Sequence, residues 1–238
     1  MREFQDIWVY LSTSPLLHLT LTLTAFVAAS FIYQKMKVNP LFNPVFISVI
    51  VIVLVLQFWE TEYQTYFEGA QFVHFLLGPA TVALAIPLYR QFARIKKSAI
   101  AIFISLLCGS ITASGSAVLI AWFLGAQSVS IISLAPKSVT APVAMGISDQ
   151  LGGLPSLTAV MVILTGIVGA TLGPILLNLM RIKKWDARGL AMGIASHGIG
   201  TARALQVNEV AGAFSGMAMG LNALATAILL PLLWKLFF

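Results

Sequence analysis

The sequence predicts an all-α, polytopic transmembrane protein, and two observations lead to this. Of its 238 residues 59% are apolar and only 9% are charged, whereas a soluble domain carries about 25% charged residues. Apolar runs recur along the chain, and a run of about 20 residues is long enough to cross a hydrocarbon core of about 30 Å as a helix. We therefore expect a single integral membrane domain over residues 1–238, with about six full spans and two re-entrant helical hairpins.

The charge pattern describes topology and does not indicate nucleic-acid binding. The formal net charge is +6, and most of the basic residues lie in short loops between apolar runs, as they do on the cytoplasmic side of membrane proteins. The single cysteine, Cys108, excludes an intrachain disulfide and a multi-cysteine metal site. No phosphate loop, paired-carboxylate site or nucleophile elbow is present. We expect no cofactor, no metal, no enzymatic activity and no nucleic-acid partner.

Four spans are expected in the first half of the chain. The third carries His74 and a central Gly78-Pro79, and the fourth is loosened by small residues that allow close helix packing. Basic loops at 35–37, 90–97 and 181–188 should lie in the cytoplasm, which places the N-terminus outside. The four expected spans cover residues 16–33, 44–58, 70–89 and 98–124.

The segment 127–155 looks unlike a span. It consists of two short apolar pieces, Val129 to Ala135 and Val139 to Ile147, separated by Pro136-Lys137-Ser138. Each piece is too short to cross alone, and the next apolar run, 157–180, must start outside to end at a basic loop. A re-entrant hairpin fits both the lengths and the parity, because irregular backbone at membrane depth is tolerated where it is buried in protein or lines a cavity.

The segment 188–208 repeats the pattern, with short pieces on either side of a break at His197 to Gly200 and a last span over 210–233. Aligning Thr140-Ala141 with Thr201-Ala202 puts the two breaks in register. Two hairpins entering from opposite faces would form an inverted repeat of the kind found in secondary transporters, here with an elevator-like architecture. Residues 1–125 would then be the scaffold and 126–238 the substrate-binding part. Alternatively, 188–208 simply spans, which gives seven crossings and an inside C-terminus near Lys235.

The chemistry at the two breaks points to a small anion. A short helix that begins near Ser138 or Thr140, with Pro142 in its first turn, directs unsatisfied N–H groups and a partial positive charge into the gap. Glycines at the second break leave room for a ligand, and Thr201 can cap the helix that follows. The candidate binding residues are Lys137, Ser138, Thr140, His197, Gly198, Gly200, Thr201 and Arg203.

Several of these residues also have a plainer interpretation. Lys137 can snorkel or pair with Asp149, and Arg203 can be a structural partner of Glu209. His197 can be a packing histidine that donates to a carbonyl, or it can contact substrate or couple protons. His74 is interpreted as structural. Asp149, Glu209 and His74 are therefore kept as coupling or structural partners of the site.

Three segments at the breaks resemble the LrgB/CidB family of bacterial inner-membrane proteins. They are Leu134 to Ala144 (LAPKSVTAPVA), Gly153 to Ala159 (GLPSLTA) and Ala195 to Leu205 (ASHGIGTARAL). Leu76 to Ala83 (LLGPATVA) is a further block, so the resemblance covers nearly the whole chain.

The resemblance implies a multi-pass protein of the bacterial inner membrane and two classes of function. Family members are described as antiholin-like or holin-like modulators of murein hydrolase export and cell lysis that act with a small LrgA/CidA-type membrane partner. A plant plastid relative exports glycolate and glycerate, and some bacterial relatives are linked to pyruvate uptake. Our first expectation is a secondary transporter of a small monocarboxylate, with proton coupling as an option, in a homo-oligomer such as a dimer. The alternative is a regulator of lysis.

Overall fold

The structure is a computed structural model that describes residues 14–36, 42, 44–76, 79, 82–83 and 85–237. Within these residues every extended regular element is a helix, so the all-α class is confirmed. The chain divides into two compact units, Met1–Ala83 and Leu84–Phe238, which are described separately here. The division expected at residue 125, between a scaffold and a substrate-binding part, concerns function and stays a prediction.

The first unit contains α2 (Pro15–Lys35), α3 (Pro44–Phe58) and α4 (Tyr63–Phe75), and α2 contacts both of the others. The hydroxyl groups of Thr22 on α2 and Tyr66 on α4 hydrogen-bond at 2.8 Å. The expected span at 70–89 is wrong in its start, because α4 begins seven residues earlier at Tyr63. The polar turn that precedes the apolar run is helical because Tyr66 is buried against α2.

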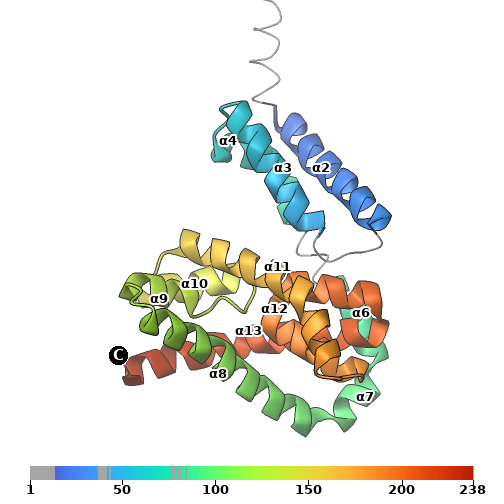
Figure 1. The fold of residues 1–238 in the computed structure, drawn as a ribbon, viewed down its shortest axis with the longest axis vertical. Coiled ribbons are helices and arrows are strands. Elements are labelled where there is room, and N and C mark those ends of the chain that lie inside the picture. Colours follow the sequence, from blue (N-terminus) through green and yellow to red (C-terminus); the bar gives the residue numbers. More distant parts are fainter. Residues whose placement is uncertain are drawn as a thin grey trace, which may run out of the picture. The chain divides into compact units, whose positions relative to one another are not determined.

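The second unit is built around three long helices, which match the apolar runs expected at 98–124, 157–180 and 210–233 (Figure 1). Shorter helices connect or cover them. In chain order the unit contains α6 (Ala85–Arg90), α7 (Phe92–Lys97), α8 (Ala99–Phe123), α9 (Ser128–Leu134), α10 (Ala141–Leu151), α11 (Pro155–Leu179), α12 (Trp185–Val207) and α13 (Glu209–Phe237).

The protein is a multi-pass membrane protein. Four described helices, α2, α8, α11 and α13, are long and apolar enough to cross a membrane. Helix α3 is apolar but has 15 residues, a length of about 22 Å. Helix α12 is not among these candidates, which are selected by length and composition alone. The total of six spans and the elevator-like architecture stay predictions.

The core of the second unit lies where α8, α12 and α13 meet. Phe214 and Met217 of α13 pack with Leu106 of α8 and Ile194 of α12. Two glycines of α12 let it lie directly on α13, since a Cβ at Gly193 would collide with the Ser215 backbone carbonyl. Such close backbone contact is the usual basis of helix association in lipid, where burial of apolar surface gives little driving force.

Candidate functional site: a junction between two broken helices

The first break separates α9 from α10 and matches the prediction of two short helical pieces. Thr140 is extended (φ −63°, ψ 146°), and α10 starts at the next residue with Pro142 in its first turn. The Ala144 N–H donates to the Thr140 carbonyl at 2.9 Å, which closes that turn. Gly152 ends α10 at φ 84°, in the left-handed region that favours glycine. The expected helix start near Thr140 is confirmed.

The two legs of this first hairpin return to the same place on α11. The hydroxyl of Thr158, which is fully buried, hydrogen-bonds with the Ser133 carbonyl at 2.9 Å and with the Ser148 hydroxyl at 2.8 Å. Ser133 lies before the break and Ser148 lies after it. The Leu154 N–H also donates to the Ser133 hydroxyl at 2.8 Å. Because residues on both sides of the break meet one side chain, α9 and α10 fold back on each other as a hairpin.

The second break is a reversal of α12 at a single residue. His197 has φ 40° and ψ −132°, the one non-helical conformation inside α12. In a straight helix residues eight positions apart are separated by about 12 Å. Here a Cβ at Gly200 would lie 2.9 Å from the carbonyl oxygen of Met192. The segment therefore doubles back after His197.

Contacts with α13 show the same reversal. On the first leg, Gly189 lies against Ala211 and Gly193 against Ser215, so residue numbers rise together. On the second leg the order is inverted, because Thr201 hydrogen-bonds with Ser215 whereas Leu205 lies against Gly212. Both legs thus lie along the same stretch of α13. A hairpin has this geometry and a straight span does not.

Two details of the second break differ from the prediction. The break was expected over His197 to Gly200, but the helix resumes at Gly198 because the unusual backbone of His197 reverses the chain in one step. Thr201 is consequently inside the helix and is not its cap, and its hydroxyl donates to the His197 carbonyl at 2.8 Å. The alignment of Thr140 with Thr201 therefore does not pair equivalent positions, since Thr140 precedes its helix.

His197 is held by a hydrogen bond across to α11. Its Nε2 lies 2.9 Å from the carbonyl oxygen of Val162, and both residues are buried. A carbonyl can only accept, so Nε2 carries the hydrogen and Nδ1 of the neutral ring is an acceptor. Gly166 makes room for the ring, since a Cβ there would lie 3.0 Å from Nε2. The hydrogen bond from His197 to the Val162 carbonyl is the contact expected of a packing histidine that donates to a carbonyl.

Asn222 of α13 joins the two breaks, and the sequence analysis missed it. Its side-chain Nδ2 donates to the Ile194 carbonyl at 3.2 Å and, in a longer contact of 3.5 Å, to the Ser138 carbonyl. Ile194 lies three residues before the reversal of α12 at His197, and Ser138 lies in the break between α9 and α10. A helix end leaves carbonyls without intrahelical partners, so the amide supplies a donor to each break. The signal that could have identified Asn222 is an uncharged polar residue inside the apolar run 210–233.

Lys137 lies beside this junction. It is half-buried, and its Nζ is 3.4 Å from the Ser138 hydroxyl. Asp149 is exposed in the last turn of α10, and no ion pair joins it to Lys137 in the described part of the chain. The proposed pairing of Lys137 with Asp149 is therefore not what the structure shows.

The remaining predicted residues lie at different distances from the junction. Glu209 pairs with Arg90 at 3.6 Å, with both side chains more than half exposed, and so corrects the expected pairing with Arg203. Arg203 is half-buried at the base of the second hairpin, where it lines a small cavity together with Arg188.

The two glycines of the second break differ in the space beside them. A Cβ added at Gly198 would lie no closer than 3.9 Å to another residue, at Met219 Sδ. Gly200 is instead crowded by its own hairpin. His74 lies on α4, and its side chain is outside the described residues.

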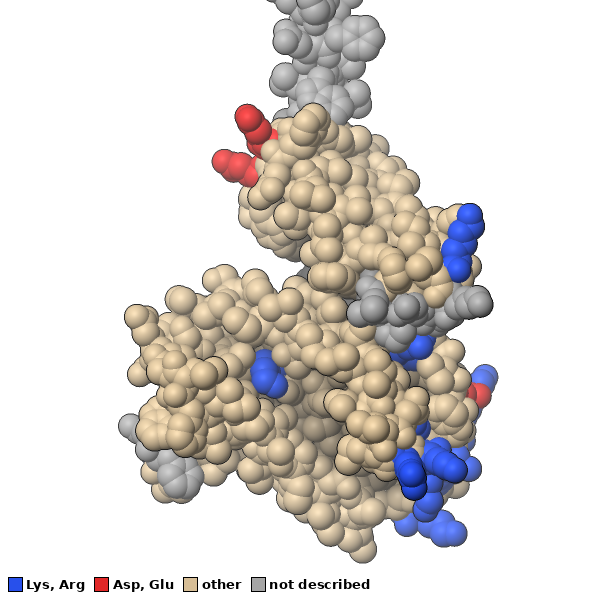
Figure 2. Space-filling view, in the orientation of Figure 1, with Lys and Arg blue, Asp and Glu red and all other residues tan. Residues whose placement is uncertain are grey.

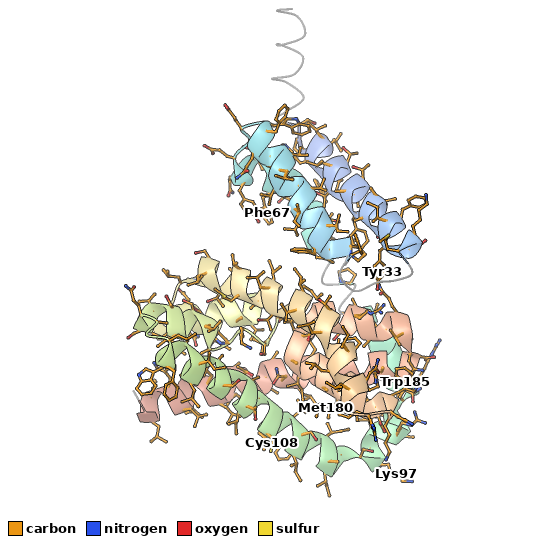
Figure 3. All side chains as sticks on the ribbon, in the orientation of Figure 1. Tyr33, Phe67, Lys97, Cys108, Met180 and Trp185 are labelled. Atoms are coloured by element: carbon orange, nitrogen blue, oxygen red, sulfur yellow. The ribbon has the colours of Figure 1, made fainter. Side chains whose placement is uncertain are left out.

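Lys and Arg side chains gather at one end of the second unit, near α7 and the connection between α11 and α12 (Figure 2). Figure 3 labels Lys97, Met180 and Trp185 at this end. The expected cytoplasmic loops at 90–97 and 181–188 thus lie together, as they should if both face one side of the membrane. Among the described residues no group of three or more His, Cys, Asp or Glu side chains is placed to hold a metal ion.

Comparisons with known proteins identify the family. The profile of the LrgB-like family matches residues 22–236. The chain is 38% identical over 215 residues to the uncharacterized protein YwbG of Bacillus subtilis, covering 90% of this chain and 95% of YwbG. It is 36% identical to the holin-like protein CidB of Staphylococcus epidermidis, covering 93% of this chain and 96% of that protein. It is 35% identical to CidB of Staphylococcus aureus, covering 94% and 97%.

No solved structure is significantly similar to the chain. The family profile and the relatives nevertheless agree over nearly the whole length, including both breaks and the helices that follow them. The chain belongs to the LrgB-like family of membrane proteins.

Proposed function

We propose that the protein is a holin-like membrane regulator that acts on murein hydrolase export and cell lysis together with a small LrgA/CidA-type partner. The observation that carries this proposal is the full-length similarity, at 35–36% identity, to proteins named holin-like CidB. The names of the relatives reported above, YwbG and holin-like CidB, state no transport substrate that would support the first expectation, a monocarboxylate carrier, in the same way. The comparisons thus favour the regulator over a transporter of stated substrate.

The regulatory role is tested by expression in a bacterium that lacks its own relatives of this chain and of the LrgA/CidA type. Murein hydrolase activity in the medium and the rate of lysis are measured with the chain alone, the partner alone, and both. A change that needs this chain supports the proposal. Unchanged lysis and hydrolase release in all three strains, with the chain present in the membrane, contradict it.

A second candidate, a carrier for a small carboxylate, is favoured by one specific observation. The two hairpin breaks meet at Asn222, and a lysine lies beside them. Broken helices that meet within the membrane are how secondary transporters build their binding sites. A regulator that acts only by oligomerising has no evident need for such a junction, and carboxylate flux can itself alter lysis.

The carrier is tested by uptake of labelled monocarboxylates into liposomes that contain the purified chain, with and without a pH gradient. His197→Ala removes the imidazole that holds the second break to α11, and Arg203→Ala removes a cation at the base of the same hairpin. We expect saturable uptake that both changes abolish while insertion is unaffected. Uptake at the wild-type rate by both variants would exclude the proposed site. If the wild-type chain takes up none of these acids, either alone or together with the LrgA/CidA-type partner, the carrier is excluded.

A further inference from the structure

An apolar cavity on the second unit has no role in either proposed function. It lies between α8 and α13 and has a volume of about 460 Å³, within the range of about 300–1,000 Å³ usual for ligand sites. Of the residues that line it, Ile102, Leu106 and Met217 are buried, whereas Phe103 and Leu224 are more than half exposed. The cavity is therefore open on the outside of the unit. Because every side chain that lines it is apolar, its occupant must be apolar as well.

The length of the cavity matches one leaflet of a bilayer. It extends along α8 from Ala99 to Leu107 and along α13 from Met217 to Leu229. At a rise of about 1.5 Å per residue, these stretches are about 12 Å and about 18 Å long. The hydrocarbon core of a bilayer is about 30 Å thick, so one leaflet contributes about 15 Å. Since α8 and α13 are both long and apolar enough to cross a membrane, the apolar ligand that fits this cavity is a lipid acyl chain.

Three cations border the cavity at one end. Ile95 of α7 lines it, and Arg94, Lys96 and Lys97 of the same short helix are exposed. Figure 3 labels Lys97 at the end of the unit where α8 begins. Within the described residues, no ion pair joins a carboxylate to any of the three. Basic residues beside a groove between membrane helices are suited to the head groups of anionic lipids.

We propose that this cavity, the α8–α13 groove, binds an anionic phospholipid, with an acyl chain between the two helices and the phosphate at the cations of α7. A second copy of this chain fits less well. In the same membrane orientation it would bring its own Arg94, Lys96 and Lys97 to the groove, and like charges brought together oppose association. The lipid site is independent of whether the protein is a regulator or a carrier.

The groove is connected to the second hairpin through the core of the unit. Three of its lining residues, Ile102, Leu106 and Met217, belong to the same cluster as Ile194 on the first leg of α12. A bound acyl chain would cover this cluster on its open side. The lipid would therefore stabilise the packing of α13 against the hairpin.

The test uses photoactivatable phosphatidylglycerol and phosphatidylcholine, which differ only in their head group and carry the reactive group on an acyl chain. The full-length chain is cross-linked in liposomes, and the labelled peptides are identified by mass spectrometry. We expect phosphatidylglycerol to label the groove about tenfold more than phosphatidylcholine, because each cation near the surface attracts anionic lipid. Both lipids should label the exposed faces of α2 and α11 equally.

Two outcomes of this experiment overturn the proposal. Equal labelling of the groove by the two lipids would identify ordinary boundary lipid, without a site for the head group. Labelling of α2 and α11 but not of the groove would mean that protein covers the cavity, and a cross-link between two copies would identify a second chain as its occupant.

A pair of charge variants locates the head group. Lys96→Gln combined with Lys97→Gln should reduce the preference for phosphatidylglycerol to about threefold or less, because one cation of α7 remains. Lys183→Gln combined with Lys184→Gln is the matched control. It removes the same charge from the connection between α11 and α12 at the same end of the unit and should keep the tenfold preference (Figure 2). All four lysines are exposed, so neither change should affect folding. An equal loss in both variants would place the attraction on the whole basic face and overturn the site.

A second pair of variants locates the acyl chain. Ala225→Leu enlarges a residue that lines the groove and should reduce its labelling by both lipids several-fold. Ala191→Leu makes the same change in the cavity between α8 and α12 and should leave the labelling of the groove unchanged. Undiminished labelling in Ala225→Leu would show that the chain does not lie in the groove. If that variant does not fold, Ala99→Leu at the end of the groove near α7 replaces it.

Discussion

The side-chain amide nitrogen of Asn222 lies 3.2 Å from the backbone carbonyl oxygen of Ile194, three residues before α12 reverses. The same nitrogen reaches the Ser138 carbonyl in the other break. One side chain on a continuous helix thus connects two discontinuous ones. The stability of both breaks should depend on it, independently of any ligand.

Asn222→Ala should lower the free energy of unfolding by about 2 kcal/mol, because it leaves two buried carbonyls without their donor. Unfolding in a titration with denaturing detergent measures this loss. The control is Thr226→Ala, one turn further along the same helix, which removes a hydrogen bond to Ser110 of α8 and should cost about 1 kcal/mol, the usual contribution of one buried hydrogen bond. A loss for Asn222→Ala no larger than that of the control would show that its contacts with the breaks do not stabilise the fold.

The backbone of His197 gives a second prediction, which separates the backbone from the side chain. Its φ of 40° is unfavourable for any residue with a Cβ, and such conformations cost about 1–3 kcal/mol. His197→Ala and His197→Gly both lose the hydrogen bond to Val162, but only glycine relieves the strain. We expect the free energy of unfolding of the glycine variant to be about 1 kcal/mol larger than that of the alanine variant.

Thermal or detergent-induced unfolding of the two His197 variants, measured side by side, checks this difference. Equal stability, or a more stable alanine variant, would show that the reversal at this position is not strained. A strained backbone conformation persists only where surrounding contacts hold it. A stability difference between the two variants would therefore show that the contacts around residue 197 hold the reversal in place.

The glycines on the first leg of α12 give a third prediction. A Cβ at Gly193 would collide with the Ser215 backbone carbonyl, so Gly193→Ala should push the hairpin away from α13 and cost about 1–3 kcal/mol. Gly220 on α13 is the control, because no atom lies within 4 Å of the Cβ that it would gain. Gly220→Ala should be neutral or stabilise the helix by up to about 1 kcal/mol. Similar losses for the two variants would contradict the close packing of α12 on α13.

The parts of the fold that could be predicted are those whose pattern is contained in a short stretch of sequence. The long helices were predictable because each apolar run is itself the signal, as at α8, α11 and α13. The first hairpin was predictable because Pro136 and Lys137 interrupt two short apolar pieces. The start of α4 was not, because its polar first turn is helical through a tertiary contact of Tyr66 with α2.

The candidate site was predictable only in part, for the same reason. Both breaks and Lys137 are visible in the local sequence. The one-residue reversal at His197 was missed, since the nearby glycines suggested a longer break and no local pattern predicts a left-handed histidine. Asn222 was missed because its role comes from contacts with Ser138 and Ile194, which are 84 and 28 residues away in the chain.

Cys108 provides the last prediction, because it is the single cysteine of the chain and lies on α8 at a cavity (Figure 3). The cavity has a volume of about 550 Å³ and lies between α8 and the first leg of α12, close to the second break. Hydroxyl groups of Ser105, Thr112 and Ser116 line its α8 side. Most of the remaining lining is apolar, so these hydroxyl groups are the partners that water in the cavity would have. Cys108 is exposed beside them, and we expect a water-soluble, membrane-impermeant thiol reagent to modify it in native membranes.

Two substitutions make this labelling specific to the cavity. Ala191→Leu places a larger side chain in the same cavity and should slow the modification of Cys108 several-fold. Ala225→Leu enlarges a residue in a separate apolar cavity between α8 and α13 and should leave the rate unchanged. The measurement is the rate of modification by the impermeant reagent compared with that by a lipid-permeant maleimide. Modification by the permeant reagent alone would mean that this face of α8 contacts lipid, and the second break would then have no aqueous access along it.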